Sequence, residues 1–405
     1  MQDLLFRAGL GRRPLDISEL SPAGNAAQDV ALRAYPFPFR AMLAICDDSR
    51  GTDPAVFEAT RAAFGYRGLE IGACTSFAED DPCAVGSARA GALKAAGLLD
   101  GLVGLPCGGA DEAAAQLAAA GLIPPVFAGG ASVAEAAPLT AAGIRFFTDD
   151  GLSGRTKFGD ALSFRHTGEL RRKFAQFDFG QFGFAGAEGA TDLRAVFEAI
   201  APTAQRAFLL NLFDAPLFTL LPTTDENTVF KRFSGPQRPS LSTLSLQLRS
   251  QFLTQLETLG GAVIIQQRLG DEALIGLGPS RERRRPAGLD ALGLHEALAL
   301  DDLAERAGDR ILVAATARVL GWLELRRRAV LTIEKQPDRW RVEVAVPLSL
   351  EREGLALTVR SDAPPVDVTV AGTANPLAMA RQPDPASPGR DCLYLEWSKR
   401  LWPSL

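Results

Sequence analysis

The stretch FRAMLAICDDSRGTDPAVFEATRAAFG, residues 39–65, contains one complete unit of the predicted fold. It begins with an uninterrupted apolar run of strand length, which is typical of a strand buried on both faces. An Asp-Pro pair at 53–54 predicts the start of a helix, and Gly65 predicts its end. Two adjacent carboxylates, Asp47 and Asp48, lie between them. The unit is therefore a strand, an acidic loop and a helix.

The same order repeats along the first part of the chain. Further apolar runs predict strands at residues 68–74, 98–105, 123–130 and 144–150. Helices are predicted between them at residues 87–97, 110–121 and 132–143. Strands that alternate with helices of this length form parallel β/α units with right-handed crossovers. Such units in succession favour a barrel or a doubly wound sheet.

The pattern changes towards the end of the sequence. Strands at 207–213 and 260–270, and helical spacing across 299–328, complete the predicted α/β part. From residue 329, apolar and polar residues alternate with period two, which predicts a small antiparallel β unit. The expected regions are an N-terminal extension at 1–35, an α/β domain at 36–328 and a C-terminal β-rich segment at 329–405.

The composition argues against several classes of partner. The 405 residues carry a net charge of −5, and 47% of them are hydrophobic, which is an ordinary balance for a globular protein. We expect no nucleic-acid partner on this basis. The sequence has no run of about 18 apolar residues and its first residues lack the order of a secretory signal, so we expect no membrane insertion and a cytoplasmic location. In that compartment the five cysteines should remain reduced thiols.

Several reactive side chains are predicted to follow strands directly. Functional groups of parallel α/β folds gather at the carboxyl ends of the strands. The candidates at these positions are Asp47, Asp48, Cys74, Cys107, Asp149 and Asp150. We expect Asp47 and Asp48 to face a central cleft there.

The order and spacing of several segments resemble a known family. The segments are FRAMLAICDDSRGT (39–52), GLEIGACTSF (68–77), AGLLDGLVGLPCGG (96–109) and GIRFFTDDGLSGRTKFGD (143–160). VFKRFSG (229–235) and LETLGGAVIIQQRLG (256–270) follow in the same order. Together they resemble the NodB-type polysaccharide deacetylases, carbohydrate esterase family four, and within it a branch found in surface-polysaccharide gene clusters. The resemblance covers roughly residues 36 to 325.

The resemblance implies a fold and a mechanism. It implies a distorted (β/α) barrel in which one Asp and two His hold a divalent metal, usually zinc. A neighbouring Asp acts as the base on the attacking water. Carried over by motif, Asp47 is the catalytic base and Asp48 the metal ligand. One carboxylate must stay on the metal while another accepts the proton of the water.

The sequence departs from this pattern at the metal ligands. The segment GLVGLPCGG (101–109) has no histidine, and the late strand ends in QQRLG (266–270), so that Gln267 or Arg268 replaces the expected histidine. Arginine cannot ligate a cation at neutral pH. The two histidines of the chain, His166 and His295, align with no ligand motif.

Three hypotheses follow from these departures. In the first, the chain is a catalytically degraded homologue without a cofactor, which binds carbohydrate or assists surface-glycan synthesis. In the second, Asp48, Cys74 and Cys107 form a substituted zinc site with one open position, and the deacetylase remains active. In the third, Asp47 and Asp48 act with Glu70 and the Asp149–Asp150 pair in metal-independent glycoside chemistry.

The predicted substrate contacts include cations as well as carboxylates. Asp48, Glu70, Asp149 and Asp150 are the candidate acidic contacts. Lys231, Arg232 and Arg268 are the candidates for an anionic sugar. The expected partner is therefore a carbohydrate or a sugar-containing substrate, with a homo-oligomer or a glycan-synthesis protein as a further possibility.

Overall fold

The computed structural model describes residues 29–128, 133–149, 220–222, 228–231, 244–245, 248–259, 261–269, 292, 294–346, 352–373 and 375–402. All structural statements below refer to these residues. The predicted strand at 207–213 and His166 lie outside them. No helix in these ranges is long and apolar enough to cross a membrane.

The strand quoted from the sequence is the centre of a three-stranded parallel sheet. Strand β2 (Ala41–Asp47) pairs with β9 (Gly261–Gln267) on one side and with β10 (Ile311–Val313) on the other. Every residue of β2 is buried, as its apolar sequence predicts. Helix α2 (Pro54–Tyr66) follows, and the Asp53 carboxylate caps it by accepting hydrogen bonds from the N–H groups of Ala55 and Val56.

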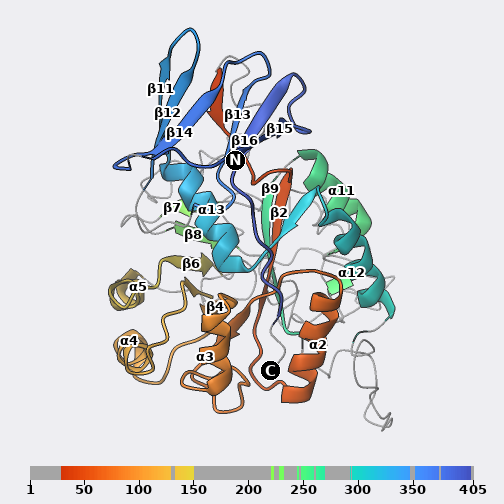
Figure 1. Ribbon diagram of the computed structural model, residues 1–405. Helices are drawn as coiled ribbons and strands as arrows, with labels where there is room; N and C mark the ends of the chain where they lie inside the picture. Colours follow the sequence, from red (N-terminus) through yellow and green to blue (C-terminus); the bar gives the residue numbers. More distant parts are fainter. Residues whose placement is uncertain are drawn as a thin grey trace, which may run out of the picture.

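A second sheet contains the remaining strands of the α/β part. Its order is β3-β4-β5-β6-β8-β7, and all neighbours are parallel except β7 and β8. The strands are β3 (Ala73–Thr75), β4 (Leu99–Leu102), β5 (Val126–Phe127), β6 (Phe146–Asp149), β7 (Leu220–Pro222) and β8 (Thr228–Lys231). Helices α3 (Ala88–Ala95), α4 (Gly109–Ala119) and α5 (Val133–Ala141) connect the first four and lie on one side of them (Figure 1).

The two sheets share one apolar interior. Met42, Ala44 and Cys46 of β2 belong to the same buried cluster as residues of β3, β5 and β6, including Cys74, Val126 and Phe146. The other face of β2 packs on α2, α11 (Ser250–Leu259) and α12 (Leu294–Arg306). Two sheets around one interior are compatible with the predicted (β/α) barrel. Among the described residues no ladder joins β2 to β3, so a closed barrel stays a prediction.

The segment 299–328 differs from the sequence prediction. Its helical spacing is interrupted by β10, which separates α12 from α13 (Thr316–Arg328). The apolar residues of β10 are fully buried because they pair with the second edge of β2. A tertiary partner therefore converts part of an apparently helical run into a strand.

The C-terminal β-rich segment forms two small sheets. One has the order β11-β12-β14 and the other β1-β13-β16-β15. The strands are β1 (Val30–Leu32), β11 (Val330–Lys335), β12 (Trp340–Ala345), β13 (Ala356–Arg360), β14 (Val366–Val370), β15 (Ala380–Pro383) and β16 (Arg390–Tyr394). Their apolar faces pack on α13 through Trp322, Leu323 and Leu325, so α13 lies between this unit and β4 (Figure 1).

Two details of this unit correct the sequence prediction. It is not purely antiparallel, because β12 and β14 run parallel. The intervening strand β13 lies in the other sheet. The chain therefore leaves this sheet after β12 and enters it again at β14 in the same direction. In addition, β1 pairs with β13, so residues 30–32 of the predicted N-terminal extension belong to the β-rich unit.

Candidate functional site

The loops after β2, β3 and β9 meet at one side of the molecule, which we call the carboxyl edge. The side chain of Asp81 connects the first two loops by accepting hydrogen bonds from Ser49 Oγ at 3.0 Å and Ser76 Oγ at 2.6 Å. The N–H of Asp48 donates to the carbonyl oxygen of Gln267 at 2.9 Å, and this hydrogen bond connects the loop after β2 to the end of β9. The predicted meeting of strand ends therefore occurs for these three strands.

Asp47 is enclosed at the end of β2. It is only 1% exposed, and its Oδ2 forms an ion pair with Arg61 of α2. Its Oδ1 accepts a hydrogen bond from the N–H of Leu269 at 2.9 Å. Burial raises the pKa of Asp47, although Arg61 and this N–H favour the charged form. The sequence prediction made Asp47 the catalytic base, and in the structure both of its oxygens already have internal partners.

The guanidinium of Arg61 itself lies against two aromatic rings. Its central carbon lies 3.6 Å from the centroid of the Phe57 ring and 5.1 Å from that of Trp402. The indole of Trp402 is fixed in turn by a hydrogen bond from Nε1 to Glu58 at 3.1 Å. Trp402 of the C-terminal tail thus helps to position the Arg61 guanidinium that pairs with Asp47.

Asp48 is bound by a second arginine. Arg50 donates from Nε to Oδ1 at 2.9 Å and from Nη2 to Oδ2 at 2.7 Å. Burial alone would raise the pKa of Asp48, but the hydrogen bonds and charge of Arg50 and the charge of Arg268 outweigh it, so the pKa lies below its usual value. The Asp48 side chain is 8% exposed, whereas that of Arg50 is 42% exposed. The accessible group at this point is therefore the cation.

Arg268 lies beside this pair, directly after β9. Its Nη2 donates to the carbonyl oxygen of Arg50 at 2.7 Å. Its Nε is buried and has no hydrogen-bond partner within the described ranges. Arg50 and Arg268 therefore place two guanidinium groups at the carboxyl edge, next to the carboxylate that the resemblance assigns to a metal.

The cysteines of the substituted zinc site are not brought together. Cys74 faces Cys46 in the buried interior, with the two Sγ atoms 3.5 Å apart. Cys107 is exposed. Within the part of the chain that the structure describes, no three or more His, Cys, Asp or Glu side chains are grouped so that they could hold a metal ion. The residues present in these ranges therefore do not fit the proposed zinc site.

The remaining predicted contacts are Asp149, Asp150, Lys231, Arg232 and Glu70. Asp149 ends β6 and is in register with Lys231 at the end of β8, so the two are neighbours on parallel strand ends. Asp150 and Arg232 lie outside the described residues. Glu70 precedes β3, at the opposite end of the strands, and the structure does not bring it to Asp47 and Asp48.

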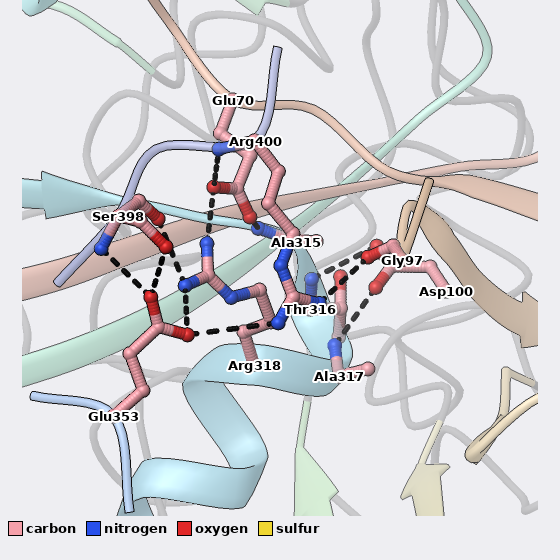
Figure 2. Close-up of polar contacts among 10 residues, drawn as sticks. All are labelled: Glu70, Gly97, Asp100, Ala315, Thr316, Ala317, Arg318, Glu353, Ser398 and Arg400. Carbon is pink, nitrogen blue, oxygen red and sulfur yellow. Dashed lines mark hydrogen bonds and ion pairs between the residues drawn. The ribbon is translucent and has the colours of Figure 1, made fainter. Parts of the chain in front are cut away.

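Glu70 instead belongs to a polar cluster at the side where the strands begin, which we call the amino edge (Figure 2). It accepts hydrogen bonds from the N–H groups of Ala315 and Arg400, both at 2.9 Å, and forms a buried ion pair with Arg318. Burial raises its pKa, opposed by the charge of Arg318. Nearby, Asp100 of β4 accepts from the N–H groups of Thr316 and Ala317, both at 2.8 Å. These carboxylates bind the N-terminus of α13.

The sequence prediction missed four of the residues that organise these edges. They are Arg50, Arg61, Asp100 and Arg318. Two of them carry a signal in the sequence. Arg61 lies on the apolar face of its helix, four positions after Phe57, and Asp100 interrupts an apolar strand run. A charge at a position that should be buried indicates a buried partner.

The comparisons with known proteins leave the family open. No family model matches the chain, and no characterised protein or solved structure is significantly similar to it. The resemblance to polysaccharide deacetylases therefore has no support beyond the sequence segments that carry it, and it remains a hypothesis.

Proposed function

We propose that the carboxyl edge binds an acidic carbohydrate without a metal, as a deacetylase-like protein that does not catalyse deacetylation. The observation that supports this most directly is the pairing of Asp48 with Arg50. Both oxygens of the carboxylate that the resemblance assigns to the metal accept hydrogen bonds from one guanidinium. A cation of the protein thus takes the position next to Asp48.

A ligand with a carboxylate group can meet a guanidinium at this edge, where Arg50 is 42% exposed beside Asp48, Asp80 and Asp81. Arg50 is accessible, and Arg268 lies against its backbone. Guanidinium groups bind carboxylates and phosphates through paired hydrogen bonds, which lysine does not reproduce. A uronic acid in a surface glycan has this chemistry, together with hydroxyl groups for the polar side chains of the loops.

Binding measurements with the full chain test the proposal. Titration calorimetry would compare an oligogalacturonate with a neutral galacto-oligosaccharide of the same length. We expect saturable binding of the acidic ligand, weakened about tenfold by Arg268→Gln, because a hydrogen bond to a charged group is lost. The matched control is Arg67→Gln, which removes an arginine that pairs with Asp301 at the end of α2.

An assay for acetate release tests the catalytic part separately. The protein is incubated with N-acetylated oligosaccharides and added zinc, cobalt or nickel. We expect no turnover that a chelator abolishes and the metal restores. Such turnover, or equal binding of the acidic and neutral oligosaccharides, would overturn the proposal.

A further inference from the structure

Two cysteines are in contact in the interior that the two sheets share. Cys46 lies on β2 and Cys74 on β3, and their Sγ atoms are 3.5 Å apart. The two residues are only 2% and 1% exposed. The other three thiols are placed elsewhere, since Cys83 belongs to a different buried cluster, Cys392 lies on β16 and Cys107 is exposed. The fold therefore brings these two thiols together.

A small movement is enough to join the two sulfur atoms. The S–S bond of a disulfide is about 2.05 Å long, so the Sγ atoms of Cys46 and Cys74 must approach by about 1.5 Å. The register partner of Cys74 on β4 is Gly101. A Cβ atom at Gly101 would lie 3.3 Å from Cys74 Sγ, so a larger residue there would restrict this sulfur. With glycine at this position, the Cys74 side chain has room to rotate towards Cys46.

The two thiols face each other across a seam between the sheets. Strand β2 belongs to one sheet and β3 to the other, and no ladder joins them among the described residues. The loops that follow the two strands are connected through side chains, because Asp81 accepts hydrogen bonds from Ser49 and Ser76. Local opening of this seam breaks no backbone ladder between β2 and β3, and such opening admits a small oxidant to buried groups.

We propose that Cys46 and Cys74 are a modification site at which a peroxide forms a reversible disulfide, and that this bond closes the seam between β2 and β3. The bond would enclose α2 and the loops on either side of it in one covalent loop. It joins the two sheets at a point where hydrogen bonds between strands do not. The inference does not depend on the function proposed for the carboxyl edge.

The reaction consumes one peroxide for each disulfide. One sulfur, as its thiolate, attacks an oxygen of the peroxide, the O–O bond breaks, and a sulfenic acid forms. The hydroxide that leaves takes up the thiol proton and becomes water. The second sulfur then attacks the sulfenic sulfur, the S–O bond breaks, and a second water leaves with the proton of the second thiol. Two thiols are oxidised to one disulfide, and hydrogen peroxide is reduced to two waters.

Peptide mass mapping of the full-length Cys107→Ser protein tests the bond. Cys107 is the exposed thiol, so its replacement prevents cross-links between molecules and leaves four of the five cysteines. The native protein is treated with hydrogen peroxide, and the remaining thiols are then blocked in denaturant. We expect one pair of linked peptides, with Cys46 in one and Cys74 in the other, and a fall from four titratable thiols to two. Dithiothreitol should restore all four.

Matched variants in the Cys107→Ser background separate this pair from other buried thiols. Cys46→Ala should form no disulfide, and Cys74→Ala is a second variant for the same comparison. Cys392→Ala also removes a buried thiol and should still form the bond. Circular dichroism of each variant confirms that the fold is retained.

Thermal unfolding tests whether the bond closes the seam. Oxidation of the Cys107→Ser protein should raise its Tm by about 5 °C, because the closed loop restricts the unfolded chain, and Cys46→Ala should show no such rise. The proposal fails if no peptide links Cys46 to Cys74, if bonds to Cys83 or Cys392 are equally abundant, or if oxidation does not raise the Tm.

Discussion

Arg61 of α2 and Asp47 of β2 form an ion pair in which both side chains are 1% exposed. The pair joins the first strand to the first helix of the α/β part. A buried ion pair adds little net stability when both partners are present, but the removal of one partner leaves an uncompensated charge. Through this ion pair and the hydrogen bond from Leu269, Asp47 fixes the start of the loop that carries Asp48 and Arg50.

We therefore expect Asp47→Asn to destabilise the protein strongly. The amide can still accept a hydrogen bond from the N–H of Leu269, but it leaves the Arg61 charge buried without a counter-charge. The expected loss is about 3 to 5 kcal/mol in the free energy of unfolding, measured by urea denaturation. Asp301→Asn is the matched control, because Asp301 is 58% exposed in its pair with Arg67 and should cost no more than about 1 kcal/mol. Equal losses for both variants would contradict the structural role of Asp47.

The second prediction concerns pH. Burial raises the pKa of Asp100 to about 6 from an ordinary value of 3.8, opposed by the N–H groups of Ala317 and Thr316. The folded state thus holds this proton more tightly than the unfolded state. The resulting stabilisation is complete below about pH 4 and is lost as the pH rises through about 6.

The Asp100→Asn variant isolates this effect, because its amide does not titrate. Between pH 4.5 and 7.5 the wild-type protein should lose about 2 kcal/mol of unfolding free energy relative to the variant. Urea denaturation at both pH values measures the difference. The prediction is wrong if the gap between the two proteins is the same at both pH values.

The sequence predicts the local elements better than their partners. The apolar run before Asp47 and the cap at Asp53 place β2 and α2 almost correctly, because both signals act within a few residues. The partners of Glu70, in contrast, are Ala315, Arg318 and Arg400, which lie more than 240 residues away. No local pattern specifies such contacts.

The same distinction explains the candidate site. The meeting of strand ends follows from parallel topology and could be predicted. The two arginines that bind Asp47 and Asp48 depend on side-chain orientation, which periodicity does not determine. The third hypothesis placed Glu70 with Asp47 and Asp48 in one acid–base site. The strand begins only at Ala73, so Glu70 lies before it, at the amino edge.

The cysteines provide a test of the interior. Cys46, Cys74, Cys83 and Cys392 are buried, and Cys107 is exposed. Burial also raises the pKa of Cys83 and that of Cys392 to about 12, which leaves little reactive thiolate at neutral pH. Ellman's reagent should therefore react rapidly with only one thiol of the native protein, and Cys107→Ser should abolish this reaction. Rapid modification of several thiols in the folded protein would contradict the described interior.

The last prediction concerns the close approach of Gly72 to Asp100. A Cβ atom added at Gly72 would lie 2.3 Å from Asp100 Oδ2 and 2.4 Å from Asp100 Cγ. The carboxylate cannot move without cost, because it accepts hydrogen bonds from Thr316 and Ala317. Gly72→Ala should therefore weaken the binding of the α13 N-terminus. Loss of one of these hydrogen bonds leaves an unsatisfied buried donor, so a loss of about 1 to 3 kcal/mol is expected.

A matched glycine and a double-mutant cycle separate this mechanism from general strain. Gly91 lies in α3 with no atom within 4 Å of an added Cβ, so Gly91→Ala should stabilise the protein by about 0.5 to 1 kcal/mol. In an Asp100→Ala background, Gly72→Ala should cost clearly less than in the wild type, because the displaced carboxylate is already absent. If the cost is the same in both backgrounds, then Gly72 does not act through Asp100. Asp100 and Glu70 bind the same helix end, so the double-mutant cycle also measures how far this helix end depends on Asp100 alone.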